Sequence, residues 1–210
     1  MAATSAGVRA FRVALRPVAV NISARQFLDR NLVAMVERIL QDASVAPDLL
    51  ELELTETLLM SDAEEAVQML RQLKATGVRL SVDDFGTGYS SLSYLKRFPL
   101  DALKIDRSFV RDAVTDPDDA TLTQTIINLG HSMRLRVVAE GVETAGQLEF
   151  LRLHGCDEMQ GYYFARPLAA EDCTRLLVEG RRLDDPEPRH DALMTPPPAA
   201  SDESLLLACA

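Results

Sequence analysis

Two hydrophobic patterns alternate along the chain from Pro17 to about Gly180. Short runs rich in Val, Ile and Leu are typical of β-strands, and longer stretches with apolar residues every three or four positions are typical of amphipathic helices. Strands separated by helices predict parallel βα units and not an antiparallel meander. Six strands are predicted in this region, at residues 18–22, 50–55, 79–84, 102–106, 136–140 and 159–164.

The predicted helices have recognisable starts and ends. Three Ser or Thr residues precede a Glu or Gln by three positions, which is the spacing of a capping box. These pairs are Ser23 with Gln26, Ser61 with Glu64, and Thr144 with Gln147. Asp116 before Pro117 predicts a fourth helix start. Gly77 and Gly155 stand where a left-handed residue is expected to end a helix.

The length of 210 residues predicts one domain. Residues 17–182 carry the βα pattern, which predicts an α/β fold, a TIM-like (β/α) barrel with about six of eight strands present. Residues 1–16 match no expected element. Residues 183–210 are rich in Asp, Glu, Pro and Ala, a composition that predicts a disordered tail.

The charge balance limits the possible ligands. With 32 acidic residues against 22 Lys and Arg, the surface repels polyanions, so duplex nucleic acid is not expected as a partner. A phosphate ester would have to be bound through cations or a few placed basic residues. No apolar run is long enough to span a membrane. Three cysteines at wide spacings are typical of a reducing cytoplasm.

Polar residues recur at or near the carboxyl ends of the predicted strands. Their separations of 20 to 36 positions match the repeat of a βα unit, so a barrel would bring them to one mouth, where barrel enzymes have their active sites. The set is Asn21, Glu53, Asp83, Asp84, Lys104, Glu140 and Gln160.

The segment Leu50–Leu54 reads Leu-Glu-Leu-Glu-Leu. With a period of two, the leucines face the helices and both glutamates face the barrel interior. An isolated segment of this kind would favour an antiparallel strand with one solvated face. The other carboxylates and the adjacent capping signals favour the barrel.

Several carboxylates and an asparagine at one mouth would repel one another unless cations were bound. Oxygen ligands suit hard divalent ions, so the set predicts Mg²⁺ or Mn²⁺. Zinc is not indicated, because the three histidines are scattered and no His or Cys pair has ligand spacing.

Lys104 is one of only three lysines, and it lies inside a predicted strand with its neighbours facing the helices. Its side chain is therefore expected to face inward, where an ammonium could orient water or stabilise phosphate charge. A purely structural ion pair with Asp83 or Asp106 is the alternative. The segment 85–91, Phe-Gly-Thr-Gly-Tyr-Ser-Ser, could be a loop that moves over a ligand, or simply a turn.

Six motifs in this order resemble the EAL domain family over about residues 17–170. They are Val20-Asn21-Ile22-Ser23, Glu53-Leu54-Thr55-Glu56, Asp83-Asp84-Phe85-Gly86-Thr87-Gly88, Leu103-Lys104-Ile105-Asp106, Ala139-Glu140-Gly141-Val142-Glu143, and Gln160-Gly161-Tyr162 with Arg166-Pro167. The resemblance implies a TIM-like barrel that hydrolyses cyclic di-GMP to linear pGpG with two Mg²⁺ or Mn²⁺ ions. It also implies a homodimer, or an upstream sensory or GGDEF domain, as possible partners.

The resemblance also implies roles for individual residues. Asn21, Glu53, Asp83, Asp84 and Glu140 correspond to the metal site, with Lys104 and Glu140 beside the attacking water. Glu56 corresponds to the glutamate that holds the glycine-containing loop. Gln160 and Arg166 correspond to residues that contact substrate.

The family's first two strands and its Glu-Ala-Leu motif have no counterpart in this sequence. One metal ligand and a phosphate-binding arginine are expected to be absent with them. Three hypotheses therefore stay open: a phosphodiesterase, a cyclic di-GMP receptor or regulatory protein-interaction module, and an inactive truncated domain.

Overall fold

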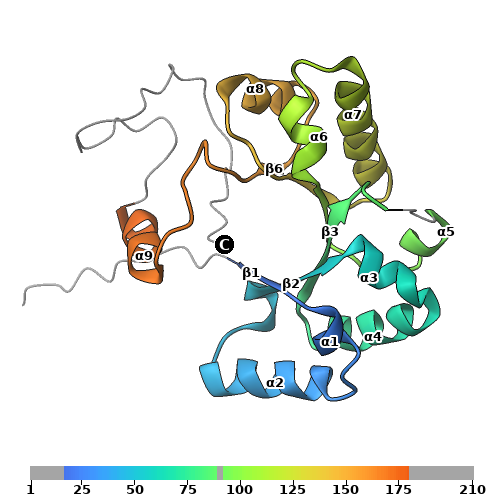
Figure 1. Ribbon diagram of the computed structural model, residues 1–210. Coiled ribbons are helices and arrows are strands. Elements are labelled where there is room, and N and C mark those ends of the chain that lie inside the picture. The colour runs from blue at the N-terminus through green and yellow to red at the C-terminus, as the bar shows by residue number, and fades with distance from the viewer. Residues whose placement is uncertain (1–16, 89–91, 180–210) are drawn as a thin grey trace, which may run out of the picture.

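The computed structural model describes residues 17–88 and 92–179 (Figure 1). Its sheet has six parallel strands in the order of the sequence. They are β1 (Val18–Asn21), β2 (Leu50–Thr55), β3 (Arg79–Phe85), β4 (Ala102–Ile105), β5 (Arg136–Ala139) and β6 (Glu158–Met159). The sheet is curled into an open half-barrel, as expected for an incomplete TIM-like barrel. The predicted N-terminal segment, residues 1–16, and the predicted tail, residues 183–210, lie outside the described residues.

The helices connect successive strands and cover the outer side of the curled sheet, with α9 on the open side (Figure 1). The α-helices are α1 (Ala24–Phe27), α2 (Leu32–Ala43), α3 (Glu56–Ser61), α4 (Ala63–Ala75), α5 (Leu92–Leu95), α6 (Arg107–Asp112), α7 (Pro117–Ser132), α8 (Ala145–Leu153) and α9 (Ala170–Glu179). A 3-10 helix, η1, spans Pro47–Leu49. Within the described residues, no helix has the length and apolar character needed to cross a membrane.

All six predicted strands are present, but the last was placed wrongly. It covers Glu158–Met159, whereas the prediction was 159–164. After Met159 the chain turns, and Val142 exchanges backbone hydrogen bonds with this turn by donating to Gln160 and accepting from Tyr163. A β-carbon on Gly161 would lie 2.3 Å from the Val142 backbone nitrogen and oxygen, so the tight approach needs glycine here.

Two of the three predicted capping boxes are confirmed, at Ser23 and Thr144. The third, at Ser61, is wrong. The chain ends one helix at Ser61 and begins the next after Asp62, whose carboxylate accepts from the backbone of Glu65. The hydroxyl of Ser61 instead donates to the carbonyl of Leu58. The start at Asp116 is confirmed.

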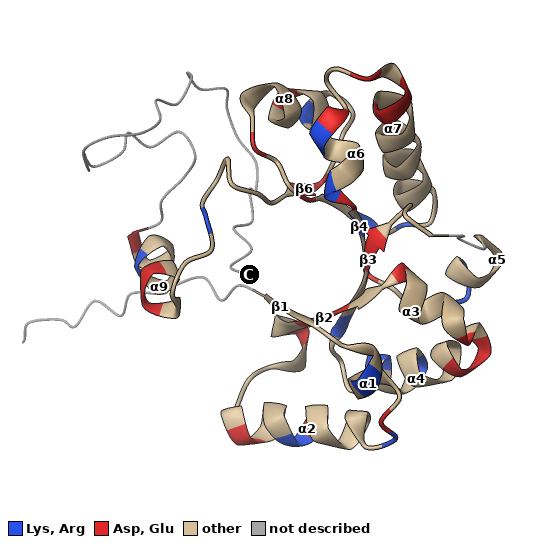
Figure 2. Cartoon of the chain, in the orientation of Figure 1, with Lys and Arg blue, Asp and Glu red and all other residues tan. Residues whose placement is uncertain are grey.

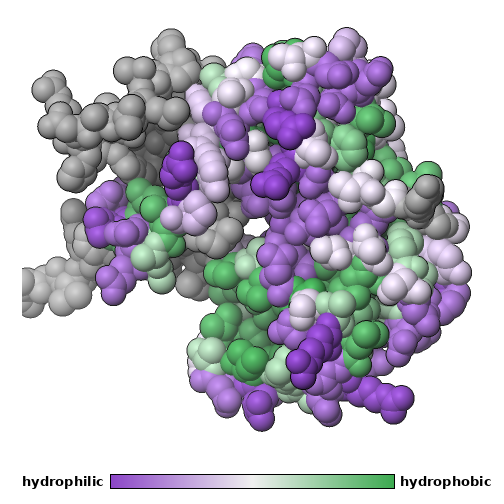
Figure 3. All heavy atoms as spheres, in the orientation of Figure 1, coloured by the Kyte–Doolittle hydropathy of each residue, from purple (hydrophilic) through white to green (hydrophobic). Residues whose placement is uncertain are grey.

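The hydrophobic core lies between the sheet and the outer helices. Leu52 and Leu54 of β2 are fully buried on the helix side, as the alternating pattern predicted. Glu51 and Glu53 are buried too, on the inner side of the sheet. In Figure 3 hydrophobic residues gather over β1 and the adjoining side of α2, while hydrophilic residues cover much of the rest of this face. On β2, the inner side of the half-barrel therefore carries two buried carboxylates.

Candidate active site at the carboxyl ends of the strands

The ammonium of Lys104 on β4 contacts three carboxylates from three other parts of the half-barrel. Its Nζ lies 2.7 Å from Oε2 of Glu53, 3.2 Å from Oδ1 of Asp83, and 2.5 Å from Oε1 of Glu140. Only 4% of the Lys104 side chain is exposed. We call Lys104 and these three carboxylates the upper cluster. The inward orientation predicted for Lys104 is confirmed, and its partners include Asp83 but not Asp106.

Strand register brings these residues together. Asn21 at the end of β1 is level with Glu53 on β2, and Thr55 is level with Asp83 on β3. Glu140 directly follows β5, where its amide donates to the carbonyl of Ile105 on β4. The strands are parallel, so their carboxyl ends meet at one mouth. Figure 2 shows acidic and basic residues together around β3, β4 and β6.

The upper cluster has an excess of negative charge, because three carboxylates share one ammonium group. Burial raises the pKa of Glu140, and the attraction of Lys104 only partly offsets it, with Asp83 and Glu53 adding repulsion. Burial likewise raises the pKa of Glu53 against the pull of Lys104. Burial disfavours the ammonium of Lys104, but the three carboxylates outweigh this and raise its pKa. The site thus favours further positive charge.

Asp83 and Asp84 are consecutive, yet both lie at the mouth of the half-barrel. The pairing of β3 with β4 shifts register between Val82 and Phe85. Within this irregular stretch Asp84 has a left-handed backbone with φ of 53°. Asp83 consequently points to Lys104, and Asp84 interacts with Asp106. Burial raises the pKa of Asp84, with Asp83 and Asp106 adding to the effect. Backbone strain of this kind is typical of functional sites.

Glu56 supports the glycine-containing loop that follows β3. It begins α3, it is 1% exposed, and its Oε2 accepts from the amide of Gly86 at 2.9 Å. A β-carbon on Gly88 would lie 3.0 Å from Oε1 of Glu56, so the loop passes close over this carboxylate. Residues 89–91 of the predicted loop lie outside the described residues.

Gln160 extends the upper cluster. Its Nε2 donates to Oε1 of Glu140 at 2.9 Å, the same oxygen that contacts Lys104. Arg166 is placed differently, because its guanidinium lies over the ring of Tyr162, 5.1 Å from the centroid, and is exposed. The structure therefore brings Gln160 but not Arg166 into contact with the predicted catalytic residues.

The donor set fits a hard divalent cation in its chemistry. Glu53, Asp83 and Asp84 offer carboxylate oxygens, and the exposed Asn21 offers an amide oxygen beside Glu53. However, over residues 17–88 and 92–179 no group of three or more His, Cys, Asp or Glu side chains is already arranged to hold a metal ion. Lys104 lies among the three carboxylates, so an ion would require them to reorient.

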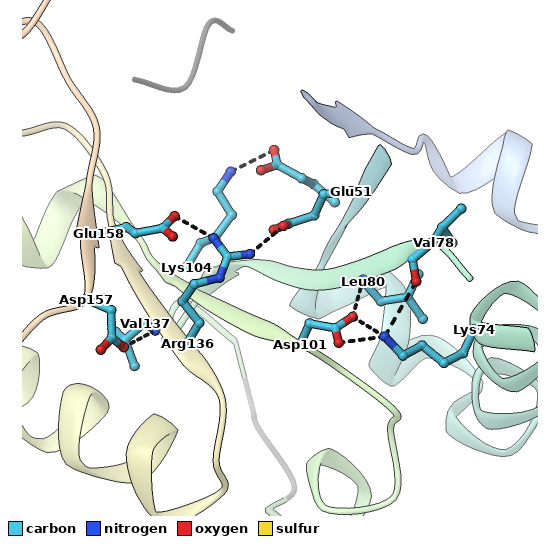
Figure 4. A network of polar contacts seen from close by, with 11 residues as sticks. Glu51, Lys74, Val78, Leu80, Asp101, Lys104, Arg136, Val137, Asp157 and Glu158 are labelled. Atoms are coloured by element: carbon cyan, nitrogen blue, oxygen red, sulfur yellow. Dashed lines mark hydrogen bonds and ion pairs between the residues drawn. The ribbon is translucent and has the colours of Figure 1, made fainter. Parts of the chain in front are cut away.

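A second group of charged residues was not predicted from the sequence. Arg136 of β5 contacts Oε2 of Glu51 on β2 and Oε2 of Glu158 on β6, each at 2.5 Å (Figure 4). We call these three residues the lower cluster. The sequence does indicate that Glu51 and Arg136 face inward, because Glu51 lies one strand period before Glu53 and Arg136 lies two periods before Glu140. Asp106, which caps α6 through Ser108, was likewise not among the predicted site residues.

A curled parallel βα sheet with acidic side chains at the carboxyl ends of its strands is the arrangement found in active sites of (β/α)-barrel enzymes. The comparison with protein families is more specific. The model of the EAL domain matches residues 2–167, so this chain belongs to the EAL domain family. The match includes residues 2–16, which the motifs alone left unassigned.

Relatives of known activity are closely similar. The chain is 49% identical over 154 residues to MucR of Pseudomonas aeruginosa, named a bifunctional diguanylate cyclase and cyclic di-GMP phosphodiesterase, covering 73% of this chain and 22% of MucR. It is 50% identical over 151 residues to the cyclic di-GMP phosphodiesterase NbdA of the same organism, covering 72% of this chain and 19% of NbdA. The chain thus spans about a fifth of the curated relatives it matches.

Solved structures agree with this assignment. The MucR phosphodiesterase in complex with cyclic di-GMP has a TM-score of 0.73 at 48% identity, covering 75% of this chain and 64% of that one. The EAL domain of Mycobacterium smegmatis DcpA has a TM-score of 0.75 at 37% identity, covering 79% and 74%. A Klebsiella pneumoniae BlrP1 complex contains manganese and cyclic di-GMP, with a TM-score of 0.68 at 30% identity, covering 74% and 40%.

Proposed function

We propose that this chain hydrolyses one phosphodiester bond of cyclic di-GMP to give linear pGpG, using Mg²⁺ or Mn²⁺. The observation that carries the proposal is the convergence of Glu53, Asp83 and Glu140 on Lys104 at the carboxyl ends of the strands. Identity of 49% to MucR and 50% to NbdA supports the substrate. The manganese complex of BlrP1 supports the choice of ion.

Bound divalent ions would offset the repulsion between the acidic protein and its anionic substrate. Asn21, Glu53, Asp83 and Asp84 are the residues that would hold them, with Glu140 at the side of the site. When bound, such ions polarise the phosphodiester, neutralise its charge and lower the pKa of a bound water. The formal charge of −10 makes direct binding of the dinucleotide by the chain's overall field unfavourable.

Glu140 and Lys104 are proposed to act on the reacting groups. Oε1 of Glu140 accepts from Lys104 and Gln160, which fixes the carboxylate in one orientation. Its raised pKa suits it to take a proton from the attacking water. The ammonium of Lys104 can then stabilise the negative charge that develops on the phosphate oxygens.

Glu56 is proposed to hold the loop after β3 in the conformation that completes the site. Its bond to the Gly86 amide ties the loop to the start of α3. We propose that Gln160 and Arg166 contact the dinucleotide, with Arg166 and Tyr162 forming an exposed cationic and aromatic surface. A phosphate or guanine base could be recognised there.

One observation favours a second candidate, a receptor that binds cyclic di-GMP without cleaving it, or a regulatory protein-interaction module. In the described part of the chain the carboxylates are neutralised in part by Lys104 and are not arranged as a ready metal site. A site of this kind could bind ligand and position ions too poorly for turnover. Its partner would be a second copy of the chain, or an upstream sensory or GGDEF domain in the cytoplasm.

Chromatographic assay of cyclic di-GMP conversion by the purified chain with Mn²⁺ separates the two candidates. The enzyme predicts pGpG formation that Asp83→Asn reduces by at least about a hundredfold. Binding of the dinucleotide in Ca²⁺ with no product in Mn²⁺ would identify the receptor instead. Neither binding nor product would contradict both.

A further inference from the structure

The lower cluster joins strands that are not neighbours in the sheet. Arg136 belongs to β5 and Glu51 to β2, and β3 and β4 lie between them. The guanidinium therefore crosses the inner side of the half-barrel, as Figure 4 shows for Arg136 between Glu51 and Glu158. Backbone hydrogen bonds of a sheet fix the spacing of adjacent strands only. The distance from β2 to β5 depends on how far the sheet curls, which a contact across the interior can restrain.

Small side chains leave room for this crossing. Ser81 on β3 is level with Ala102 on β4, which in turn is level with Arg136 on β5. Ser81 and Ala102 are completely buried. Longer residues at these two inward positions would fill the space that the arginine side chain uses. The sequence thus combines a long cation on β5 with short residues at the same level on β4 and β3, while Arg79 is the β3 residue level with Glu51.

The contacts of the lower cluster restrain the relative positions of Glu51 and Glu158. Arg136 uses Nη2 for Glu51 and Nη1 for Glu158, so one planar guanidinium binds two carboxylates. The side chains of Glu51 and Glu158 are only 7% and 14% exposed. A planar guanidinium with two donors in fixed directions restrains its partners more than an ammonium does.

The same two strands supply the upper cluster. Glu53 follows Glu51 by two residues on β2, and Glu140 follows Arg136 by four residues at the end of β5. Both carboxylates reach Lys104, at 2.7 Å and 2.5 Å. A change in the distance between β2 and β5 would move these two carboxylates apart and open the contacts around Lys104.

We propose that Arg136 is a positioning residue, which holds β2 and β5 at the spacing where Glu53 and Glu140 share one cation. Its consequence for cyclic di-GMP hydrolysis rests on the proposed function. The effect of Arg136 on the arrangement of the upper cluster does not depend on that function. Arg136 contacts Glu51 and Glu158, neither of which is proposed to act on the reacting groups, and it acts through the backbone of β2 and β5.

Three variants of the full chain test the proposal. The triple variant Glu51→Gln, Arg136→Met, Glu158→Gln removes the ion pairs and leaves no buried charge without a partner. Arg136→Lys keeps the charge, but one ammonium cannot replace the two-armed contact. Leu70→Ala is the matched control, because Leu70 is fully buried on α4 and its truncation destabilises the fold without touching the charged interior.

Lysine acetylation gives a readout that depends neither on metal nor on activity. The chain has three lysines, and Lys96 is exposed while Lys104 is buried. Peptide mass spectrometry after brief treatment with an acetylating ester, well below the melting temperature, reports the rate at Lys104 relative to Lys96. We expect the triple variant to raise this ratio by about tenfold or more, since its opening would cost less free energy. Leu70→Ala should leave the ratio near that of the wild type.

Mn²⁺ binding by the same proteins connects the spacing to the proposed function. The triple variant is expected to bind Mn²⁺ about tenfold more weakly, as is typical when the supports of metal-binding residues are removed. If the wild type binds no Mn²⁺, the proposed function fails, and acetylation still decides the inference. Unchanged protection of Lys104 in a folded triple variant would overturn it. If the triple variant does not fold, Arg136→Lys provides the test. We expect it to raise the acetylation rate at Lys104 relative to Lys96 by about threefold, and an unchanged ratio would contradict the proposal.

Discussion

Glu140 and Lys104 form the closest contact of the upper cluster, with 2.5 Å between Oε1 and Nζ. The two residues come from adjacent strands, β4 and the end of β5, and are 36 positions apart in the sequence. Glu140 is thereby held by a cation and by Gln160, while Lys104 is held by two further carboxylates. Stability and the proposed chemistry depend on the same charges.

Lys104→Met should strongly destabilise the fold, because it leaves three carboxylates at the mouth without their shared cation. We expect a loss of about 3–5 kcal/mol in the free energy of unfolding, measured by urea titration at neutral pH. Lys74→Met is the control. Lys74 pairs with Asp101 at a partly exposed position, so its loss should be within about 1 kcal/mol. Equal losses for the two variants would contradict the central place of Lys104.

Gly161→Ala should also destabilise the chain, by more than about 2 kcal/mol, because a methyl group would overlap the backbone of Val142. Gly161 has φ of 155°, which adds strain for any side chain. Gly146→Ala offers a contrast, since its nearest neighbours lie at 3.7 Å or more and it lies within α8. That substitution should stabilise the protein slightly, by up to about 1 kcal/mol, in thermal unfolding. Similar melting temperatures for the two variants would be the contrary result.

Glu56→Ala should loosen the loop after β3. The amide of Gly86 would lose its carboxylate acceptor, so its hydrogen exchange should quicken by about tenfold, measured by mass spectrometry on the peptide that contains it. Glu64→Ala removes an exposed carboxylate that pairs with Arg97, and should leave this exchange rate unchanged. A Gly86 amide that exchanges equally slowly in both variants would show that Glu56 does not hold the loop.

Cys156 should be unreactive in the folded protein. It is a free, buried thiol, and burial raises its pKa to about 12. A raised pKa keeps the thiol protonated as the pH rises, so the thiolate fraction at pH 8 is about one in ten thousand. Iodoacetamide should therefore label the Cys156 peptide only after denaturation. Rapid labelling at pH 8 in the native state would show that the thiol is more accessible than its surroundings indicate.

Much of the fold was predictable because its signals are local. The apolar alternation of β2, the caps at Ser23 and Thr144, and the inward direction of Lys104 each depend on residues within a few positions. The end of the last strand was not, because the turn at Gly161 is set by contact with Val142, nineteen positions earlier. The cap at Asp62 was missed because two helices there adjoin without a connecting loop.

The site was predictable to a similar extent. Period-two alternation placed Glu53 and Lys104 correctly, but it could not foresee the left-handed backbone at Asp84, which directs Asp83 and Asp84 to different partners. The strand period indicates that Glu51 and Arg136 both face inward, but it does not indicate that they pair, since the pairing depends on how far the sheet curls. Arg166 illustrates the same limit, because a motif gives no information on the stacking of its side chain over Tyr162.

Mn²⁺ titration followed by electron paramagnetic resonance is the most direct test of the acidic site. The wild-type chain is expected to bind Mn²⁺, and Asp83→Asn should weaken binding by about tenfold or more, because it removes a carboxylate from the centre of the site. Glu64→Gln, which changes an exposed carboxylate that pairs with Arg97, should bind as the wild type does. Absence of binding by the wild type, or equal binding by the wild type and Asp83→Asn, would contradict a divalent cation site at the ends of these strands.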